Sequence, residues 1–208
     1  MTAPIPPNEP KRLKVLWQYE VLDTVPEEVF DDLTELAARI CEAPIAMISL
    51  VDEDRQWFKS KLGITLSETS RDISFCAYAI TQPGLFIVPD AAVDRRFANH
   101  PFVIAEPRIR FYAGAPLITP DGHALGTLCV LDKVPRDLTH DQRQALRILA
   151  HHVVSQLELR RHSRELGTVR RQTARLQRDL DKARAQLAAA RRRPKPAPAP
   201  RKARTKRP

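Results

Sequence analysis

The residues of this chain best suited to covalent or metal chemistry are three cysteines and six histidines. No histidine stands at a metal-ligand spacing from a Cys, Asp or Glu, so we predict no metal site. No glycine-rich phosphate loop occurs either, and no Ser-His-Asp set stands out. The sequence therefore identifies no cofactor, and Cys76 is the main candidate for covalent chemistry.

Cys76 follows a polar segment and lies on a predicted short helix that could face a pocket. A thiolate here would sense redox state or attach a ligand covalently, and a cysteine-based enzyme would need Cys76 to have a low pKa. A neutral thiol would instead be a small buried hydrophobe. Because no His or Lys flanks Cys76 to lower its pKa, the structural role is favoured.

Polar residues near the ends of predicted strands and helices form a second group of candidates. They would either line a pocket for a polar ligand or pair with one another and brace a long loop at 91–110, and bracing is favoured. With the cysteine included, the predicted ligand-binding set is Arg71, Cys76, Tyr78, Asp90, Arg110 and Tyr112.

The elements that must position these residues are predicted from hydrophobic spacing. Short apolar runs predict strands at 45–51, 56–62, 85–88, 111–118 and 124–131. Three- and four-residue spacing predicts helices at 11–22, from 27 to Pro44, at 73–80 and from 139 onward. Segments 63–72 and 91–110 are predicted loops. This order predicts an α+β fold, an antiparallel sheet with helices on one side.

Local signals refine these boundaries. Thr24 with Glu27, and Thr139 with Gln142, have the spacing of helix capping boxes. Residues 120–122 read Pro-Asp-Gly, which predicts a turn between the last two strands. On the strand at 56–62, alternation points either Trp57 or Phe58 outward. That side chain would form a partner surface or pack under the N-terminal helix, and packing is favoured.

Charge is distributed unevenly along the chain. Residues 160–208 hold 18 Lys/Arg and 3 Asp/Glu, a balance of +15, whereas residues 1–159 have a balance of −6. Mobile positive charge without aromatic residues suits attraction to a phosphate backbone rather than base recognition. A solubilising tail or an arm that docks on an acidic protein would have the same composition. The predicted polyanion-binding residues are Arg191, Arg192, Arg193, Lys195, Arg201, Lys202, Arg204, Lys206 and Arg207.

Heptad spacing in the last predicted helix indicates a coiled coil. The apolar seam consists of Leu166, Thr173, Leu180 and Leu187 at one position and Val169, Leu176, Ala183 and Ala190 at the other. Four heptads of this kind predict a homodimer that pairs through this helix.

The chain resembles the GAF domain, a sensory module of signalling proteins, from about Arg12 to Arg161. The blocks that carry the resemblance are 21–24 (VLDT), 48–52 (ISLVD), 55–60 (RQWFKS), 74–77 (SFCA), 110–117 (RFYAGAPL) and 125–130 (LGTLCV). This resemblance implies a central antiparallel sheet of five or six strands, a ligand cavity between the sheet and its loops, and terminal helices that pair between chains. Relatives often have His two residues after the cysteine, where this chain has Tyr78.

The predicted organisation is a disordered N-terminus at 1–10, a GAF domain at 11–160, a basic coiled-coil helix at 161–193 and a disordered tail at 194–208. The N-terminus has neither the charged nor the apolar region of a signal peptide, and no apolar stretch is long enough to span a bilayer. We therefore expect a cytoplasmic protein with no membrane partner.

The predicted function is that of a sensory or regulatory module that is not an enzyme. It would bind a small molecule or sense redox state in the GAF pocket and signal through a dimeric helix. The alternative is a protein that binds DNA, RNA or another polyanion, or a scaffold, whose GAF fold has no ligand.

Overall fold

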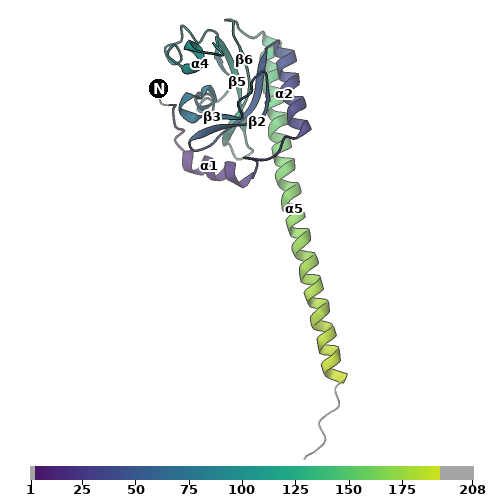
Figure 1. Ribbon diagram of the computed structural model, residues 1–208. Coiled ribbons are helices and arrows are strands. Elements are labelled where there is room, and N and C mark those ends of the chain that lie inside the picture. The colour runs from purple at the N-terminus through teal and green to yellow at the C-terminus, as the bar shows by residue number, and fades with distance from the viewer. Residues whose placement is uncertain (1–2, 193–208) are drawn as a thin grey trace, which may run out of the picture. The chain divides into compact units, whose positions relative to one another are not determined.

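A single antiparallel sheet of six strands organises the structure, in the order β3-β2-β1-β6-β5-β4 (Figure 1). The computed structural model describes residues 3–192, without the side chains of residues 187 and 189–192. The strands are β1 (Ile45–Val51), β2 (Arg55–Leu62), β3 (Glu68–Ser70), β4 (Phe86–Val88), β5 (Phe111–Ile118) and β6 (Ala124–Asp132). The predicted antiparallel sheet of five or six strands is thus confirmed.

Five α-helices accompany the sheet in the described residues. They are α1 (Glu9–Gln18), α2 (Glu28–Cys41), α3 (Phe75–Ala79), α4 (Pro101–Ile104) and α5 (His140–Arg192). The chain divides into two units, Met1–His162 and Ser163–Pro208. The first part of α5 therefore belongs to the unit that holds the sheet.

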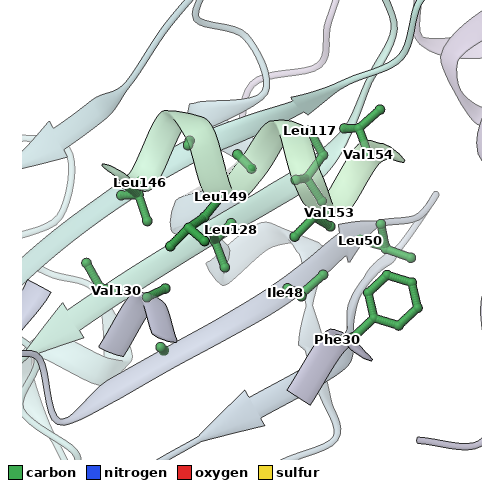
Figure 2. Packing of buried hydrophobic residues seen from close by; sticks show 14 of the residues in the cluster. Phe30, Ile48, Leu50, Leu117, Leu128, Val130, Leu146, Leu149, Val153 and Val154 are labelled. Atoms are coloured by element: carbon green, nitrogen blue, oxygen red, sulfur yellow. The ribbon is translucent and has the colours of Figure 1, made fainter. Parts of the chain in front are cut away.

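Both faces of the sheet are covered. On one face, Leu128 and Val130 of β6 pack with Leu146 and Leu149 of α5, and Phe30 of α2 joins the same core (Figure 2). On the other face, a second core includes α3, α4 and the loops around them. Every residue of β1 is buried, so its apolar side chains need cover on both sides. The expectation of helices on one side only was therefore wrong.

The two faces share the central strands because side chains alternate along a strand. Leu128 and Val130 belong to the core under α5, whereas Cys129 and Leu131 belong to the core under α3. On β2, Trp57 and Phe58 divide in the same way and are each 8% exposed. Both side chains are therefore packed, as favoured, and neither is an exposed partner surface, because both faces of β2 are covered.

One predicted capping box is present and the other is not. At the start of α5, Thr139 and Gln142 exchange hydrogen bonds of 3.0 and 3.2 Å. At the start of α2, Glu27 caps without a side-chain hydrogen bond to the helix. Its carboxylate instead accepts hydrogen bonds from Lys59 and Arg160. The buried Lys59 ammonium needs this partner, which explains why Glu27 is not used for capping.

Two predicted irregular segments contain regular structure. The segment 63–72 forms β3 as an edge strand and then enters a 3₁₀ turn at Arg71–Ile73. At the N-terminus, α1 begins at Glu9 and Ala3 is buried, inside the range 1–10 that was predicted to be disordered. The hairpin turn is as predicted, with Gly122 at a positive φ of 81°.

Beyond His162, α5 continues as a helix to Arg192. Its apolar heptad residues Leu166, Val169, Leu176 and Leu180 are 45–70% exposed. The coiled coil and the dimer stay predictions, because a single chain does not test them. In the described part of the chain, none of the helices combines the length and apolar character that crossing a membrane requires.

Candidate functional site

An apolar cavity of about 60 Å³ lies in the core beneath α3 and α4. Strands β1, β2, β5 and β6 contribute its floor, and the segments 64–69 and 102–109 contribute its outer wall. Its lining residues are Ile45, Met47, Gln56, Phe58, Ile64, Leu66, Thr69, Ile73, Phe75, Cys76, Phe102, Pro107, Ile109, Tyr112, Cys129 and Leu131. Such a lining favours a small, mostly apolar occupant.

An aromatic cluster holds one wall of the cavity in place. Phe75 stacks on Phe97 and on Tyr112, with ring centroids 4.3 and 5.2 Å apart. His100 fixes the adjoining loop, because its Nε2 contacts the Ile73 carbonyl at 2.7 Å while its Nδ1 accepts from the Phe102 N–H at 3.0 Å. Burial lowers the pKa of His100, so the ring is neutral near pH 7.

The start of α3 is held by hydrogen bonds within the chain. The Ser74 hydroxyl accepts a hydrogen bond of 3.0 Å from the Ala77 N–H and donates one to the Gln56 side chain. This N-cap fixes the first turn of α3, which carries Cys76, against strand β2.

Two thiols meet at the floor of the cavity. The sulfurs of Cys76 and Cys129 are 3.7 Å apart, although the residues are 53 positions apart in the sequence. The Tyr112 hydroxyl donates a hydrogen bond of 3.3 Å to Cys76 Sγ. Gly114 leaves room for that hydroxyl, since a Cβ at this position would lie 2.2 Å from it.

The two thiols differ in acidity. Burial raises the pKa of Cys76, but hydrogen bonds from Cys129 and from nearby hydroxyl groups outweigh it and leave the pKa below its ordinary value. Burial and the adjacent Cys76 raise the pKa of Cys129 well above its ordinary value. Cys76 is therefore the thiol of the pair that ionises first.

The predicted ligand-binding residues do not form one cluster. Cys76 and Tyr112 line the cavity. Tyr78 packs edge-on against Phe97, outside the lining. Arg110 donates to the Val103 carbonyl at 2.9 Å and so braces the loop at 91–110 from within, directly before β5. Asp90 caps that loop by accepting from the Ala92 N–H.

Arg71 has a partner that the sequence did not indicate. Its guanidinium pairs with the Glu9 carboxylate of α1 at 2.6 Å and donates to the Asp52 carbonyl at 2.9 Å. Arg12 also binds Glu9, at 2.7 Å, and all three side chains are at most 10% exposed. This buried ion triad anchors α1 to the β1–β2 turn and to the segment leading into α3.

Sequence reasoning missed Cys129 and Phe75 as site residues. Alternation along the 124–131 segment predicts that Cys129 lies on one face of a strand. It does not predict which face that is, or which residue Cys129 contacts. The predicted polyanion-binding residues 193–207 lie outside the described residues, as do the side chains of Arg191 and Arg192. Within residues 3–192, no group of three or more metal-ligating side chains converges.

Comparison with known proteins identifies the fold. The GAF domain family model matches residues 25–157. The GAF domain of an Acinetobacter phosphoenolpyruvate-protein phosphotransferase superposes with a TM-score of 0.54 at 17% identity, covering 74% of this chain and 95% of that chain. A free methionine-R-sulfoxide reductase from Neisseria meningitidis, solved with its substrate, gives a TM-score of 0.54 at 14% identity and covers 74% and 88%. These two structures support the fold alone.

A curated relative is more similar in sequence. A cyclic di-GMP phosphodiesterase of Pseudomonas aeruginosa is 47% identical over 135 residues, which is 65% of this chain and 23% of the relative. The chain therefore matches less than a quarter of that protein's length. The prediction that the protein is not an enzyme is contradicted by this relative, whose name is that of an enzyme. Composition and spacing gave no sign of this link.

Proposed function

Because the chain belongs to the GAF domain family, we propose that it is a regulatory module of cyclic di-GMP signalling. In this proposal the cavity binds a small, mostly apolar molecule, and its occupancy controls a cyclic di-GMP phosphodiesterase activity through α5. The observation that carries the proposal is the 47% identity to a phosphodiesterase. The cavity beneath α3 is the proposed binding site for the signal molecule.

The size of the cavity limits what it holds without rearrangement. Its volume of about 60 Å³ suits an occupant of a few non-hydrogen atoms. A larger ligand would move the outer wall, where Leu66 is 47% exposed and neither Ile64 nor Phe102 is fully buried. The floor belongs to the paired central strands, so the wall is the part that yields.

Side chains of β6 point alternately toward the cavity and toward α5, so this strand connects the two. Cys129 and Leu131 face the cavity, while Leu128 and Val130 pack in the core with Leu146 and Leu149 of α5 (Figure 2). A ligand that displaces β6 would therefore alter the packing of α5. Ligand binding would shift the equilibrium between two packings of the helix on the sheet.

Dimerisation through α5 is part of the same proposal. Leu166, Val169, Leu176 and Leu180 recur at heptad spacing and are largely exposed, which suits pairing with a second copy. Arg170 lies next to this seam in the heptad, and Arg171, Arg175 and Arg178 lie on the outer face of the helix; all four are exposed. Their mutual repulsion across a dimer would be reduced by salt or by a bound anion.

Native mass spectrometry of the full chain purified from its host tests for a ligand. We expect a mass increment in the wild type and in the control L62W, whose site is 41% exposed and outside the cavity. The increment should be lost in L66W, which enlarges a side chain of the cavity wall. Wild-type protein without any increment contradicts the ligand proposal.

Cyclic di-GMP levels in host cells that carry the same three proteins test the output. A changed level in cells with L66W, and an unchanged level with L62W, would support the proposal. Equal levels in all three strains would contradict it.

A second candidate function is polyanion binding, which the charge balance of +15 over residues 160–208 favours. The mobility of a DNA fragment, measured with the full chain and with a chain that lacks residues 191–208, tests it. Binding that falls steeply with salt and disappears on truncation supports this function. No shift at low salt would refute it.

A further inference from the structure

Cys76 and Cys129 are two thiols at one wall of a cavity large enough for a small oxidant. Both side chains are nearly inaccessible from the surface, at 1% and 0% exposure, and both line the cavity. Their sulfurs are 3.7 Å apart, and a disulfide needs about 2.05 Å. Cys76 lies in the first turn of the short helix α3, so a small movement of that turn or of the Cys76 side chain would close the gap.

We propose that Cys76 and Cys129 form a dithiol site that reduces a small hydroperoxide within the cavity and is converted to a disulfide. This activity goes beyond the proposed regulatory function and needs no other ligand. The cavity of about 60 Å³ has room for hydrogen peroxide, which has two heavy atoms. Leu66, half exposed in the outer wall, marks the side from which the oxidant enters.

The reaction has two steps. In the first, the Cys76 thiolate attacks one peroxide oxygen, the O–O bond breaks, and Cys76 becomes a sulfenic acid. The proton lost by Cys76 leaves with the departing hydroxide as water. In the second, Cys129 sulfur attacks Cys76 sulfur, the S–O bond breaks, and the second hydroxide leaves with the Cys129 proton as water. The two thiols lose two electrons, and the peroxide gains them to become two water molecules.

The surroundings assign the roles of the two cysteines. The Tyr112 hydroxyl donates to Cys76 Sγ at 3.3 Å, and a hydrogen bond of this kind stabilises a thiolate. Burial and the nearby Cys76 raise the pKa of Tyr112, so its hydroxyl keeps the proton that it donates. The one proton of the Cys129 thiol has two acceptors within 3.7 Å, Cys76 Sγ and the Met47 carbonyl, which suits a protonated thiol beside a thiolate. Cys76 is thus the attacking thiolate and Cys129 the resolving thiol.

The third cysteine provides a matched control. Cys41 is 0% exposed on α2, in the core on the opposite face of the sheet. Burial raises its pKa to about 11. It has neither the cavity nor a neighbouring thiol, so it should not react with peroxide in the folded protein.

Peroxide treatment of the folded, fully reduced full chain tests the site. We expect free thiols to fall from three to one, and peptide mapping without reduction to join Cys76 to Cys129. The C41S variant should form the same disulfide. In C129S a 1,3-dione should trap the sulfenic acid on Cys76, and in C76S no disulfide should form.

The wild-type experiment needs no variant, so a variant that fails to fold does not obscure the result. Wild-type protein that keeps all three thiols, under conditions that oxidise free glutathione, overturns the proposal. A disulfide that involves Cys41 overturns it as well. Wild-type protein that forms this disulfide but carries no ligand mass increment would instead count against the regulatory function alone.

Discussion

The buried triad of Glu9, Arg12 and Arg71 should respond strongly to the loss of one charge. The change E9Q keeps the size of the side chain and one acceptor, but it removes the carboxylate that pairs with both guanidinium groups at 2.6 and 2.7 Å. The Arg12 and Arg71 side chains are only 1% and 8% exposed, so solvent would not replace the lost partner.

The expected cost is about 3 kcal/mol in the free energy of unfolding. Breaking a buried ion pair by removing one partner costs about 3–5 kcal/mol. The lower end applies because Arg12 also donates to the Val51 carbonyl at 2.6 Å and Arg71 to the Asp52 carbonyl at 2.9 Å. For a domain of this size the loss corresponds to a fall in Tm of about 6–12 °C.

Two controls separate the triad from other effects of the same substitution. E28Q and E9Q each remove an acid from the first turn of a helix, but Glu28 of α2 is exposed. E28Q therefore reports the helix-dipole contribution alone. E35Q breaks an exposed pair with Arg39, whose side chain is 76% exposed, and should cost less than about 1 kcal/mol. Urea unfolding of the three variants gives the comparison. A cost for E9Q no greater than that for either control would refute the stabilising role of the triad.

The same triad predicts part of the acid sensitivity. Burial alone would raise the pKa of Glu9, but hydrogen bonds from Arg12 and Arg71 outweigh it and hold the pKa below its ordinary 4.5. Because the folded-state pKa is the lower one, the stabilisation is fully present above pH 4.5. It is lost as the pH falls through the folded-state value. Stability of E9Q should therefore fall less steeply below pH 4.5 than that of the wild type.

Three further predictions test other parts of the structure. G126A should destabilise the domain by about 3 kcal/mol or more in urea unfolding, since the new Cβ would lie 1.9 Å from the Ser49 carbonyl oxygen. L176K should convert the proposed dimer to a monomer in analytical ultracentrifugation, because it places a charge in the heptad seam. Y112F should slow peroxide oxidation of Cys76 and shift its pH profile upward, because it removes a donor to the thiolate.

Matched variants accompany these changes. G84A adds a Cβ with nothing within 4 Å and should leave stability nearly unchanged. Q177K places the same charge beside Leu176 on the exposed surface and should leave the dimer intact. Equal effects in either matched pair would contradict the corresponding argument, as would an unchanged pH profile in Y112F.

Local patterns were sufficient to predict most of the sheet. The predicted strands at 45–51 and 124–131 correspond to β1 and β6, because both are apolar runs bounded by clear breaks. The capping box at Thr139 and Gln142 marked the start of α5 because both of its partners are local. By contrast, β3 has the polar sequence Glu-Thr-Ser and exists because it pairs with the edge of β2, which no local pattern shows.

The site was harder to predict because its contacts join distant segments. Glu9 and Arg71 are 62 positions apart, and Cys76 and Cys129 are 53 apart. Each pairing depends on sheet register and on which face of the sheet a helix covers. The sequence identified Cys76 and Tyr112 as candidates from their place in the chain, but not the thiol partner that gives them a possible chemistry.

The proposed function depends most on the cavity beneath α3 and its connection to α5, and xenon is a direct probe of both. Apolar protein cavities bind xenon, and methyl NMR of the full chain under xenon pressure reports where it binds. We expect saturable shifts at Met47 and Leu131, which line the cavity, and smaller shifts at Leu128 and Leu149 across the sheet. Shifts absent from Met47 and Leu131, or confined to those two without any response at Leu149, would contradict the account.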